Sequence, residues 1–292
     1  MSKIPTTKVL AELLELLQLE RIEQNLFRGQ SQDLGWGNVF GGQVLGQALS
    51  AAEQTVPEAR SIHSLHGYFL RIGDASLPIV YDVDCIRDGK SFTTRRVVAI
   101  QNGRAIFNMS ASFQKQEDGF DHQDLMPAVD GPDTLMSQRD LALENIDDIP
   151  EPFRERATCE RPIEIRPIDP VNPLKAVVRD PQRHIWYRTA GELPDKPSTH
   201  QYLLAYASDF NLLGSAMLPH GISWLTPGMQ VASLDHAMWF HRPFRMDDWL
   251  LYAIDSPSAS GARGLARGRF FAKDGTLVAS VMQEGLMRQW KG

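Results

Sequence analysis

Cysteine is scarce in this chain of 292 residues, which contains only Cys85 and Cys159. The two show no metal-binding or redox spacing, and so few in a chain of this length indicate a reducing compartment and not a disulfide framework. No apolar run is long enough to span a bilayer. Residues 8–24 have leucines at helical spacing interrupted by acids, which predicts an amphipathic helix and not a signal peptide. We therefore expect a soluble cytoplasmic protein with no membrane insertion.

Several motifs of catalysis and nucleotide binding are also missing. There is no G-x-S-x-G, so a serine-nucleophile hydrolase would lack its elbow. The Gly-Lys-Ser at 89–91 looks like the end of a P-loop, but Asp84 stands where that motif needs its first glycine. His63 and His66 are three residues apart on a predicted strand and so point to opposite faces, which makes them a poor metal pair. We expect neither a metal nor a cofactor.

The net charge of −6 is unevenly distributed. Residues 117–160 carry thirteen acidic residues against three arginines, a charge of −10, which leaves the remainder of the chain at about +4. This acidic, proline-containing stretch predicts a solvated linker between two halves, with a helix near 134–146. The mildly basic remainder suits an anionic ligand, but it has no Lys/Arg block or aromatic platform and does not predict a nucleic-acid binder.

Both halves of the chain predict the same order of elements: a lone strand, a long apolar helix and an antiparallel meander. The first half has its strand at 25–31, its helix at 43–56 and an Asn-Gly hairpin turn at 102–103. The second half has its strand at 184–190 and its helix at 200–213. This layout predicts an α+β fold.

An apolar helix wrapped by its own curved sheet is the hotdog arrangement, so two copies predict a double hotdog with the sheets joined edge to edge. The domains that we expect are an N-terminal hotdog at 1–116, the acidic linker at 117–160 and a C-terminal hotdog at 161–292.

Aligning the halves shows that three polar positions of the second are apolar in the first. The aligned pairs are Ala51 with Asp209, Ile62 with Ser233, and Ala111 with Gln283. A duplicated module that keeps an acid, a hydroxyl and an amide in one copy predicts a single active site per chain, in the C-terminal hotdog.

The same three residues also have a purely structural interpretation. Asp209 ends the apolar helix segment YLLAYASDF, whose other end Ser198 or Thr199 can cap. Burying a carboxylate there is costly unless it is paired, so Asp209 could simply cap a neighbouring element. Ser233 and Gln283 could satisfy backbone groups of their strands, because buried polar groups are usually hydrogen-bonded.

Four segments resemble the type II acyl-CoA thioesterases, the bacterial TesB family: YASDF, SLDHAMWFHRPF, VMQEG and FRGQSQDLGWGNVFGGQVLGQAL. The resemblance covers nearly the whole chain. It implies a double hotdog that hydrolyses fatty acyl-CoA to free fatty acid and coenzyme A, as a homodimer or homotetramer. It also implies a catalytic trio of Asp209, Ser233 and Gln283. The hydroxyl is a threonine in some members of the family and a serine here.

These residue types suit hydrolysis by a bound water. Asp209 can accept the proton of the water as a general base, while Ser233 and Gln283 orient it. An oxyanion site is also needed, and a helix N-terminus would supply it at either Gly41–Gln43 or His200–Gln201.

Other functions and contacts stay open on the residues alone. A hotdog hydratase or dehydratase would need a catalytic histidine, for which His200 is the candidate, and a non-catalytic acyl-CoA-binding module would need no trio. His236 and His241 are expected to pack or bond locally. Trp224, Met217 and Met229 could line an acyl tunnel or belong to the core. The candidates for contacts to coenzyme A phosphates are Arg71, Arg242, Arg263, Arg267 and Arg269.

Overall fold

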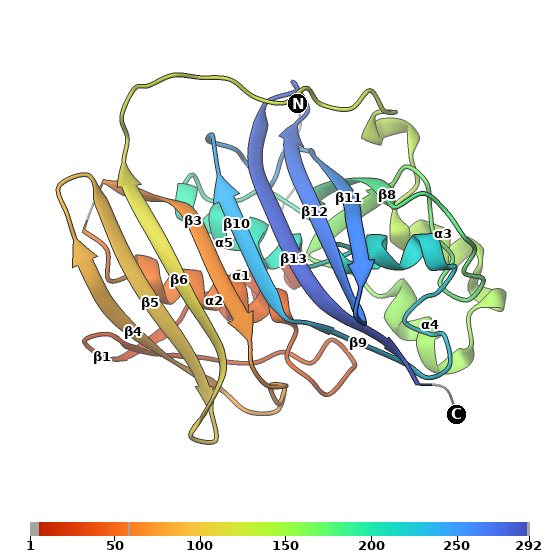
Figure 1. The fold of residues 1–292 in the computed structure, drawn as a ribbon, viewed down its shortest axis with the longest axis horizontal. Coiled ribbons are helices and arrows are strands. Elements are labelled where there is room, and N and C mark those ends of the chain that lie inside the picture. The colour runs from red at the N-terminus through yellow and green to blue at the C-terminus, as the bar shows by residue number, and fades with distance from the viewer. Residues whose placement is uncertain (1–5, 58, 291–292) are drawn as a thin grey trace.

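The computed structural model describes residues 6–57 and 59–290 of the chain, and Figure 1 shows its fold. The helix expected at 8–24 forms only in its first part: Thr7 caps it by accepting from the N–H of Leu10, Leu10 and Leu13 are buried, and it ends at Leu16 before a strand at Glu20–Glu23. The elements of the first half are α1 (Lys8–Leu16), β1 (Glu20–Glu23), β2 (Leu26–Gly29), α2 (Gly41–Glu53), β3 (Arg60–Phe69), β4 (Ile79–Asp88), β5 (Phe92–Gln101) and β6 (Arg104–Lys115).

Short helices connect this half to the second. They are η1 (Pro132–Thr134), α3 (Gln138–Glu144), η2 (Ile146–Asp148) and α4 (Glu151–Thr158). The second half then repeats the order of the first. Its elements are β7 (Ile163–Pro167), β8 (Gln182–Thr189), α5 (Pro197–Ser208), η3 (Leu213–His220), β9 (Met229–Ser233), β10 (Asp235–Phe240), β11 (Leu250–Ser260), β12 (Arg263–Ala272) and β13 (Leu277–Gln289).

All the strands belong to one antiparallel sheet that runs across both halves. Its order is β1-β2-β4-β5-β6-β3-β10-β13-β12-β11-β8-β7, with β9 paired to the end of β13. The halves join where β3 pairs with β10, with Leu65 opposite Met238 and Tyr68 opposite Asp235. This edge-to-edge junction is the one that the repeat predicts.

The two long helices lie next to each other on one face of the sheet, as Figure 1 shows for α2 and α5. They approach closely because α2 begins with two glycines: a Cβ on Gly42 would lie 2.2 Å from the carbonyl oxygen of Tyr206 in α5. The main apolar core fills the space between the helices and the sheet. The fold is therefore the expected α+β double hotdog.

Several local expectations are wrong. The predicted helix at 200–213 begins at Pro197 and ends at Ser208, and Lys196 is its N-cap without a side-chain bond, so neither Ser198 nor Thr199 caps it. Proline at the first helical turn needs no N–H partner, which explains the earlier start. The strands β1 and β7 were not predicted, and the meander of the second half begins with two short strands, β9 and β10, that Leu234 separates.

The acidic connector is mostly exposed, as its composition predicts, but part of it packs on the second half. Met126, Val129 and Leu135 pack on a second apolar cluster that includes Trp186 and Leu251. Its acids stay exposed but pair with cations of the second half; these pairs are Asp121 with Arg242, Asp124 with Arg269, and Asp133 with Lys273. The helix expected near 134–146 is reduced to α3, flanked by the 3-10 turns η1 and η2.

The division into domains at 1–116, 117–160 and 161–292 stays a prediction. Within residues 6–57 and 59–290, no helix has the length and hydropathy needed to cross a membrane.

Candidate active site

Asp209, Ser233 and Gln283 lie together in the second half. The side-chain amide of Gln283 donates to Asp209 Oδ1 at 3.0 Å and to Ser233 Oγ at 2.5 Å. One nitrogen therefore bridges the acid and the hydroxyl. Three segments that are distant in the chain bring these groups within one hydrogen-bonded cluster.

Local structure explains how each side chain reaches this point. Asp209 is the C-cap of α5, directly after an almost wholly buried helix. Alternation along β13 turns Gln283 inward, and this side chain is only 1 % exposed. Ser233 is the last residue of β9 and lies opposite Gly285 of β13. One residue, Leu234, separates it from the start of β10.

Burial raises the pKa of Asp209 from 3.8 to about 6, and hydrogen bonds from Gln283 and from the backbone N–H of Gly42 oppose that rise. The residue as a whole is half-buried. A carboxylate with a pKa near 6 is ionised at neutral pH and is a stronger base than an ordinary aspartate.

The N-terminus of α2 lies against this carboxylate. A Cβ on Gly41 would be 2.7 Å from Asp209 Oδ2 and 3.0 Å from the ring of Phe69, and Gly42 donates its N–H to Asp209. His200 lies nine residues before Asp209 on the same helix, roughly 13 Å away at the α-helical rise. Of the two helix N-termini that the sequence left open, only that of α2 contacts Asp209.

The histidines have structural partners. The N–H of Met246 donates to Nδ1 of the buried His200 at 3.0 Å. His236 is fully buried with Nε2 3.0 Å from Ser208 Oγ, and His241 Nε2 lies 2.9 Å from Ser280 Oγ. The expectation that His236 and His241 bond locally is confirmed.

Aromatic rings pack on one another next to the cluster. Phe40 stacks on Phe210 with ring centres 4.3 Å apart and meets Tyr206 edge to face at 5.3 Å. The three residues of the suggested acyl tunnel do not share one environment: Met217 is buried, Met229 is half-buried and Trp224 is 53 % exposed.

The first half has no polar cluster at the aligned positions. Ala51, Ile62 and Ala111 are all buried in its core. Ala111 faces Arg95 across the sheet, and the buried Arg95 side chain donates to Asp88 at 2.8 Å and to Thr55. In the second half Gln283 faces Ala266 instead. The buried polar side chain of the first half, Arg95, is therefore on β5, whereas that of the second half, Gln283, is on β13.

Most of the candidate arginines already have carboxylate partners. These pairs are Arg242 with Asp121, Arg263 with Glu284, Arg267 with Asp255, and Arg269 with Asp124. Arg71 is exposed and donates to the carbonyl oxygen of Ala105 at 2.6 Å.

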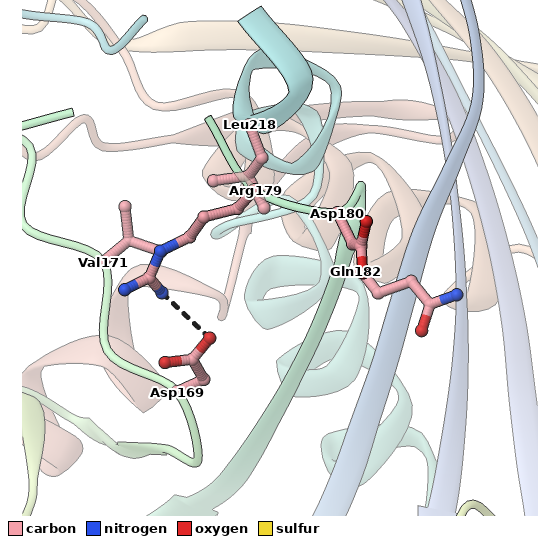
Figure 2. Close-up of a pocket in the computed structure, with 6 residues that line it drawn as sticks. All are labelled: Asp169, Val171, Arg179, Asp180, Gln182 and Leu218. Atoms are coloured by element: carbon pink, nitrogen blue, oxygen red, sulfur yellow. Dashed lines mark hydrogen bonds and ion pairs between the residues drawn. The ribbon is translucent and has the colours of Figure 1, made fainter. Parts of the chain in front are cut away.

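Two hollows in the surface lie away from the cluster. The first has a volume of about 370 Å³, and among its lining residues Arg179 and Asp169 form an ion pair with an N–O distance of 2.9 Å. Figure 2 shows these residues and the pair. A second, of about 310 Å³, is lined by Trp239, Arg267 and other residues. Neither contains a member of the trio, so hydrogen bonding and the buried carboxylate, not cavity size, locate the candidate site. Within the described residues, no group of three or more His, Cys, Asp or Glu side chains is placed to hold a metal ion.

Residues that sequence reasoning missed surround Asp209. They are Tyr187, Tyr252 and Asn211, whose contacts reach the residues next to Asp209 in the chain. The strand tyrosines look like ordinary core in the sequence. Gly42, which donates to Asp209, falls instead within the Gly41–Gln43 segment that the sequence had already singled out.

Comparisons with known proteins agree with this geometry. Residues 31–114 match the family model described as the acyl-CoA thioesterase N-terminal domain, and residues 152–286 match the acyl-CoA thioesterase model. The chain is 45 % identical to acyl-CoA thioesterase 2 of Haemophilus influenzae over 280 residues, covering 96 % of this chain and 98 % of the relative.

Solved structures give the same result. The crystal structure of the acyl-CoA thioesterase II TesB2 of Mycobacterium marinum is 45 % identical, with a TM-score of 0.78 over 96 % of this chain and 99 % of that one. A hotdog-fold protein of Alicyclobacillus acidocaldarius, at 18 % identity, has a TM-score of 0.76 over 96 % and 99 % of the two chains, a likeness of fold alone.

Proposed function

Since this chain belongs to the type II acyl-CoA thioesterases and is a thioester hydrolase, we propose that a water held by Asp209, Ser233 and Gln283 attacks its substrate. The observation that carries the proposal is the amide of Gln283, which bonds both to the raised-pKa carboxylate and to the hydroxyl. Burying a carboxylate costs folding free energy, and buried acids with raised pKa values are typical of functional sites.

The hydrogen-bond directions give each group a separate task. Ser233 Oγ accepts from Gln283, so its own O–H is free to donate to a lone pair of the water. Asp209 accepts a proton of the same water. The remaining lone pair of the water then faces the thioester carbonyl carbon, and this positioning lowers the barrier.

The reaction then balances without a covalent enzyme intermediate. As the water oxygen forms its bond to the carbonyl carbon, Asp209 takes the proton, and the collapse of the tetrahedral intermediate breaks the C–S bond. The leaving thiolate has a thiol pKa of roughly 8.5 if cysteine is a guide, so it leaves readily. The proton on Asp209 then passes to the thiolate, which restores the base.

We place the oxyanion site at the N-terminus of α2, Gly41–Gln43. The first N–H groups of a helix stabilise negative charge. Of these three, the N–H of Gly42 donates to Asp209 and that of Gln43 to the carbonyl oxygen of Phe40 at 3.1 Å, so the N–H of Gly41 is the donor that we propose for the oxyanion. This end of α2 lies against Asp209, whereas α5 turns its carboxyl end toward the site. Glycine at 41 and 42 keeps that approach clear.

The substrate that we propose is a fatty acyl-CoA, with the acyl chain near the rings of Phe40, Phe69 and Phe210. Arg71 is the proposed contact to the coenzyme A phosphates, because the four other candidate arginines are already ion-paired. We further propose that the protein works in the cytoplasm, where the free, exposed Cys85 and Cys159 would stay reduced, and that it is a homodimer or homotetramer.

The decisive experiment measures thiol release from a panel of short to long acyl-CoAs. We expect Asp209→Asn to lower turnover by orders of magnitude, and wild-type kcat/KM to rise with pH through about 6 as Asp209 ionises. Asp235→Asn is the matched control, because burial also raises the pKa of Asp235 while its side chain accepts from the N–H of Glu284. Full activity of folded Asp209→Asn would overturn the proposed role.

A pair of variants separates this reaction from hydration or dehydration by a histidine. Gln283→Ala should abolish thiol release because it removes the bridge between acid and hydroxyl. His200→Ala should retain kcat, because His200 bonds to Met246 and lies a helix length from Asp209. Loss of turnover in His200→Ala alone, with the protein folded, would favour the histidine mechanism.

A further inference from the structure

Two tyrosines hold the backbone on either side of Asp209. The hydroxyl of Tyr252 donates to the carbonyl oxygen of Ser208 at 2.8 Å, and the hydroxyl of Tyr187 donates to that of Phe210 at 3.3 Å. The last carbonyls of a helix have no intrahelical partner and need another donor when they are buried. Here the carbonyl groups of the residues before and after the proposed general base are each held by a side chain from outside the helix.

Both tyrosines are buried on neighbouring strands of the sheet. Tyr187 lies on β8 and Tyr252 on the adjacent strand β11, and both are 0 % exposed. Their ring centres are 5.6 Å apart, and Tyr252 stacks on Phe270 at 3.9 Å. A tightly packed ring has one position for its hydroxyl, so the sheet transmits a fixed position to the end of α5.

The residue after Phe210 reinforces this arrangement. Asn211 has φ of +64°, in the left-handed region that few residues other than glycine adopt. Its side-chain amide donates to the hydroxyl of Tyr187 at 2.7 Å, and its Oδ1 accepts from Arg183 at 3.3 Å. The Tyr187 hydroxyl thus accepts from Asn211 and donates to Phe210, which sets the direction of its hydrogen bond.

Resting on the proposed role of Asp209, we propose that Tyr187 and Tyr252 are positioning residues that aim this carboxylate at Gln283 and the attacking water. Asp209 lies just beyond the last helical residue, where a helix frays most easily. Without the two O–H donors, the buried carbonyl of Ser208 and the part-buried carbonyl of Phe210 would each lose a hydrogen bond, and the turn would shift to satisfy them. A shift of about 1 Å at a reacting group can cost about 100-fold in rate.

The test compares tyrosine-to-phenylalanine variants, which keep the ring and remove only the hydroxyl. We expect Tyr252→Phe and Tyr187→Phe each to lower kcat by about 10-fold with KM unchanged, and the double variant by more, because water positioning and not substrate binding is disturbed. Asn211→Gly, which keeps the left-handed backbone but releases Tyr187, should lower kcat as Tyr187→Phe does.

The matched control is Tyr202→Phe. Tyr202 is also buried and lies on α5 itself, but its hydroxyl donates to Glu53 at 2.8 Å and not to the turn at 208–211. It should lose comparable thermal stability while kcat stays at the wild-type value. If Tyr187→Phe and Tyr252→Phe behave like this control, the two tyrosines contribute only to stability and the inference is wrong. Full activity of Asp209→Asn in the same assay would instead overturn the proposed function on which the inference rests.

Discussion

At the scale of single residues, two buried titratable groups close to the cluster make stability depend on pH in opposite directions. Asp209 has its pKa raised by burial, and His236, which bonds to the preceding Ser208, has its pKa lowered by burial. Both therefore favour the neutral form, although the proposed reaction needs Asp209 ionised. Activity and stability make opposite demands on Asp209, as is common at functional sites.

The first prediction concerns the pH dependence of this cost. A pKa raised from 3.8 to about 6 contributes stability that is fully present below the unfolded value and is lost as pH rises through about 6. Asp209→Asn should therefore gain stability relative to the wild type between about pH 4 and about pH 7, by up to about 3 kcal/mol. Urea unfolding at each pH measures the difference. A difference that does not change with pH would mean that Asp209 keeps an ordinary pKa.

The second prediction has the opposite sign. Burial lowers the pKa of His236 from 6.5 to about 3, so its contribution to stability is present above the unfolded value and is lost as pH falls toward 3. As pH falls from about 6.5 to about 4.5, we expect the free energy of unfolding of His236→Gln to rise relative to that of the wild type by about 3 kcal/mol. Thermal or urea unfolding across this range checks it, and equal pH slopes for the two proteins would contradict it.

At the scale of elements, the contact between α2 and α5 brings the helix N-terminus to the carboxylate. No side chain fits between them at Gly42, where a Cβ would lie 2.2 Å from a backbone oxygen of α5. Rotating a side chain cannot relieve a contact with backbone, so one of the helices would have to move. The same contact therefore sets both the packing and the geometry of the proposed oxyanion site.

Gly42→Ala tests this contact. Alanine favours a helix by about 1 kcal/mol over glycine, but the clash should win, with a net loss of about 1–3 kcal/mol and a fall in kcat. Gly119→Ala is the control, because a Cβ there meets nothing within 4 Å. Thermal unfolding and thiol release measure both. Wild-type stability and kcat in Gly42→Ala would show that the helices adapt easily.

At the scale of the whole molecule, one continuous sheet carries two hotdogs that are alike in architecture and unlike in chemistry. The first keeps Ala51 and Ala111 in its core and places the buried Arg95 opposite Ala111. The second places Gln283 opposite Ala266, next to Asp209. The asymmetry supports one site per chain.

Ala51→Ser and Ala111→Ser test this asymmetry. Each adds one buried hydroxyl, which should cost about 1–3 kcal/mol where it finds no partner and less on α2, where it can bond one turn back. Neither should change kcat, because the first half takes no part in the reaction at these positions. Thiol release from the folded variants measures this. Loss of turnover without unfolding would show that the first half contributes chemistry there.

The amino-acid sequence by itself determined the repeated order of elements, the hairpin turns and the three positions where polar residues replace apolar ones. These are local patterns, since alternation, helical spacing and turn residues act over a few positions and survive in any context. They also led to Asp209, Ser233 and Gln283, which the structure brings together and whose catalytic role the variants above test.

Only the tertiary structure decided which helix N-terminus meets Asp209. It also decided which donors bond to the carbonyl oxygens of the neighbouring Ser208 and Phe210. The bond from Tyr252 to Ser208 joins residues 44 positions apart, and nothing in the strand LLYAIDS distinguishes this tyrosine from ordinary core. The composition of the acidic connector likewise predicts a solvated segment, because only the partly buried Met126, Val129 and Leu135, among many charges, pack on the second half. Contacts of this kind depend on how elements pack in space, and spacing along the chain does not encode them.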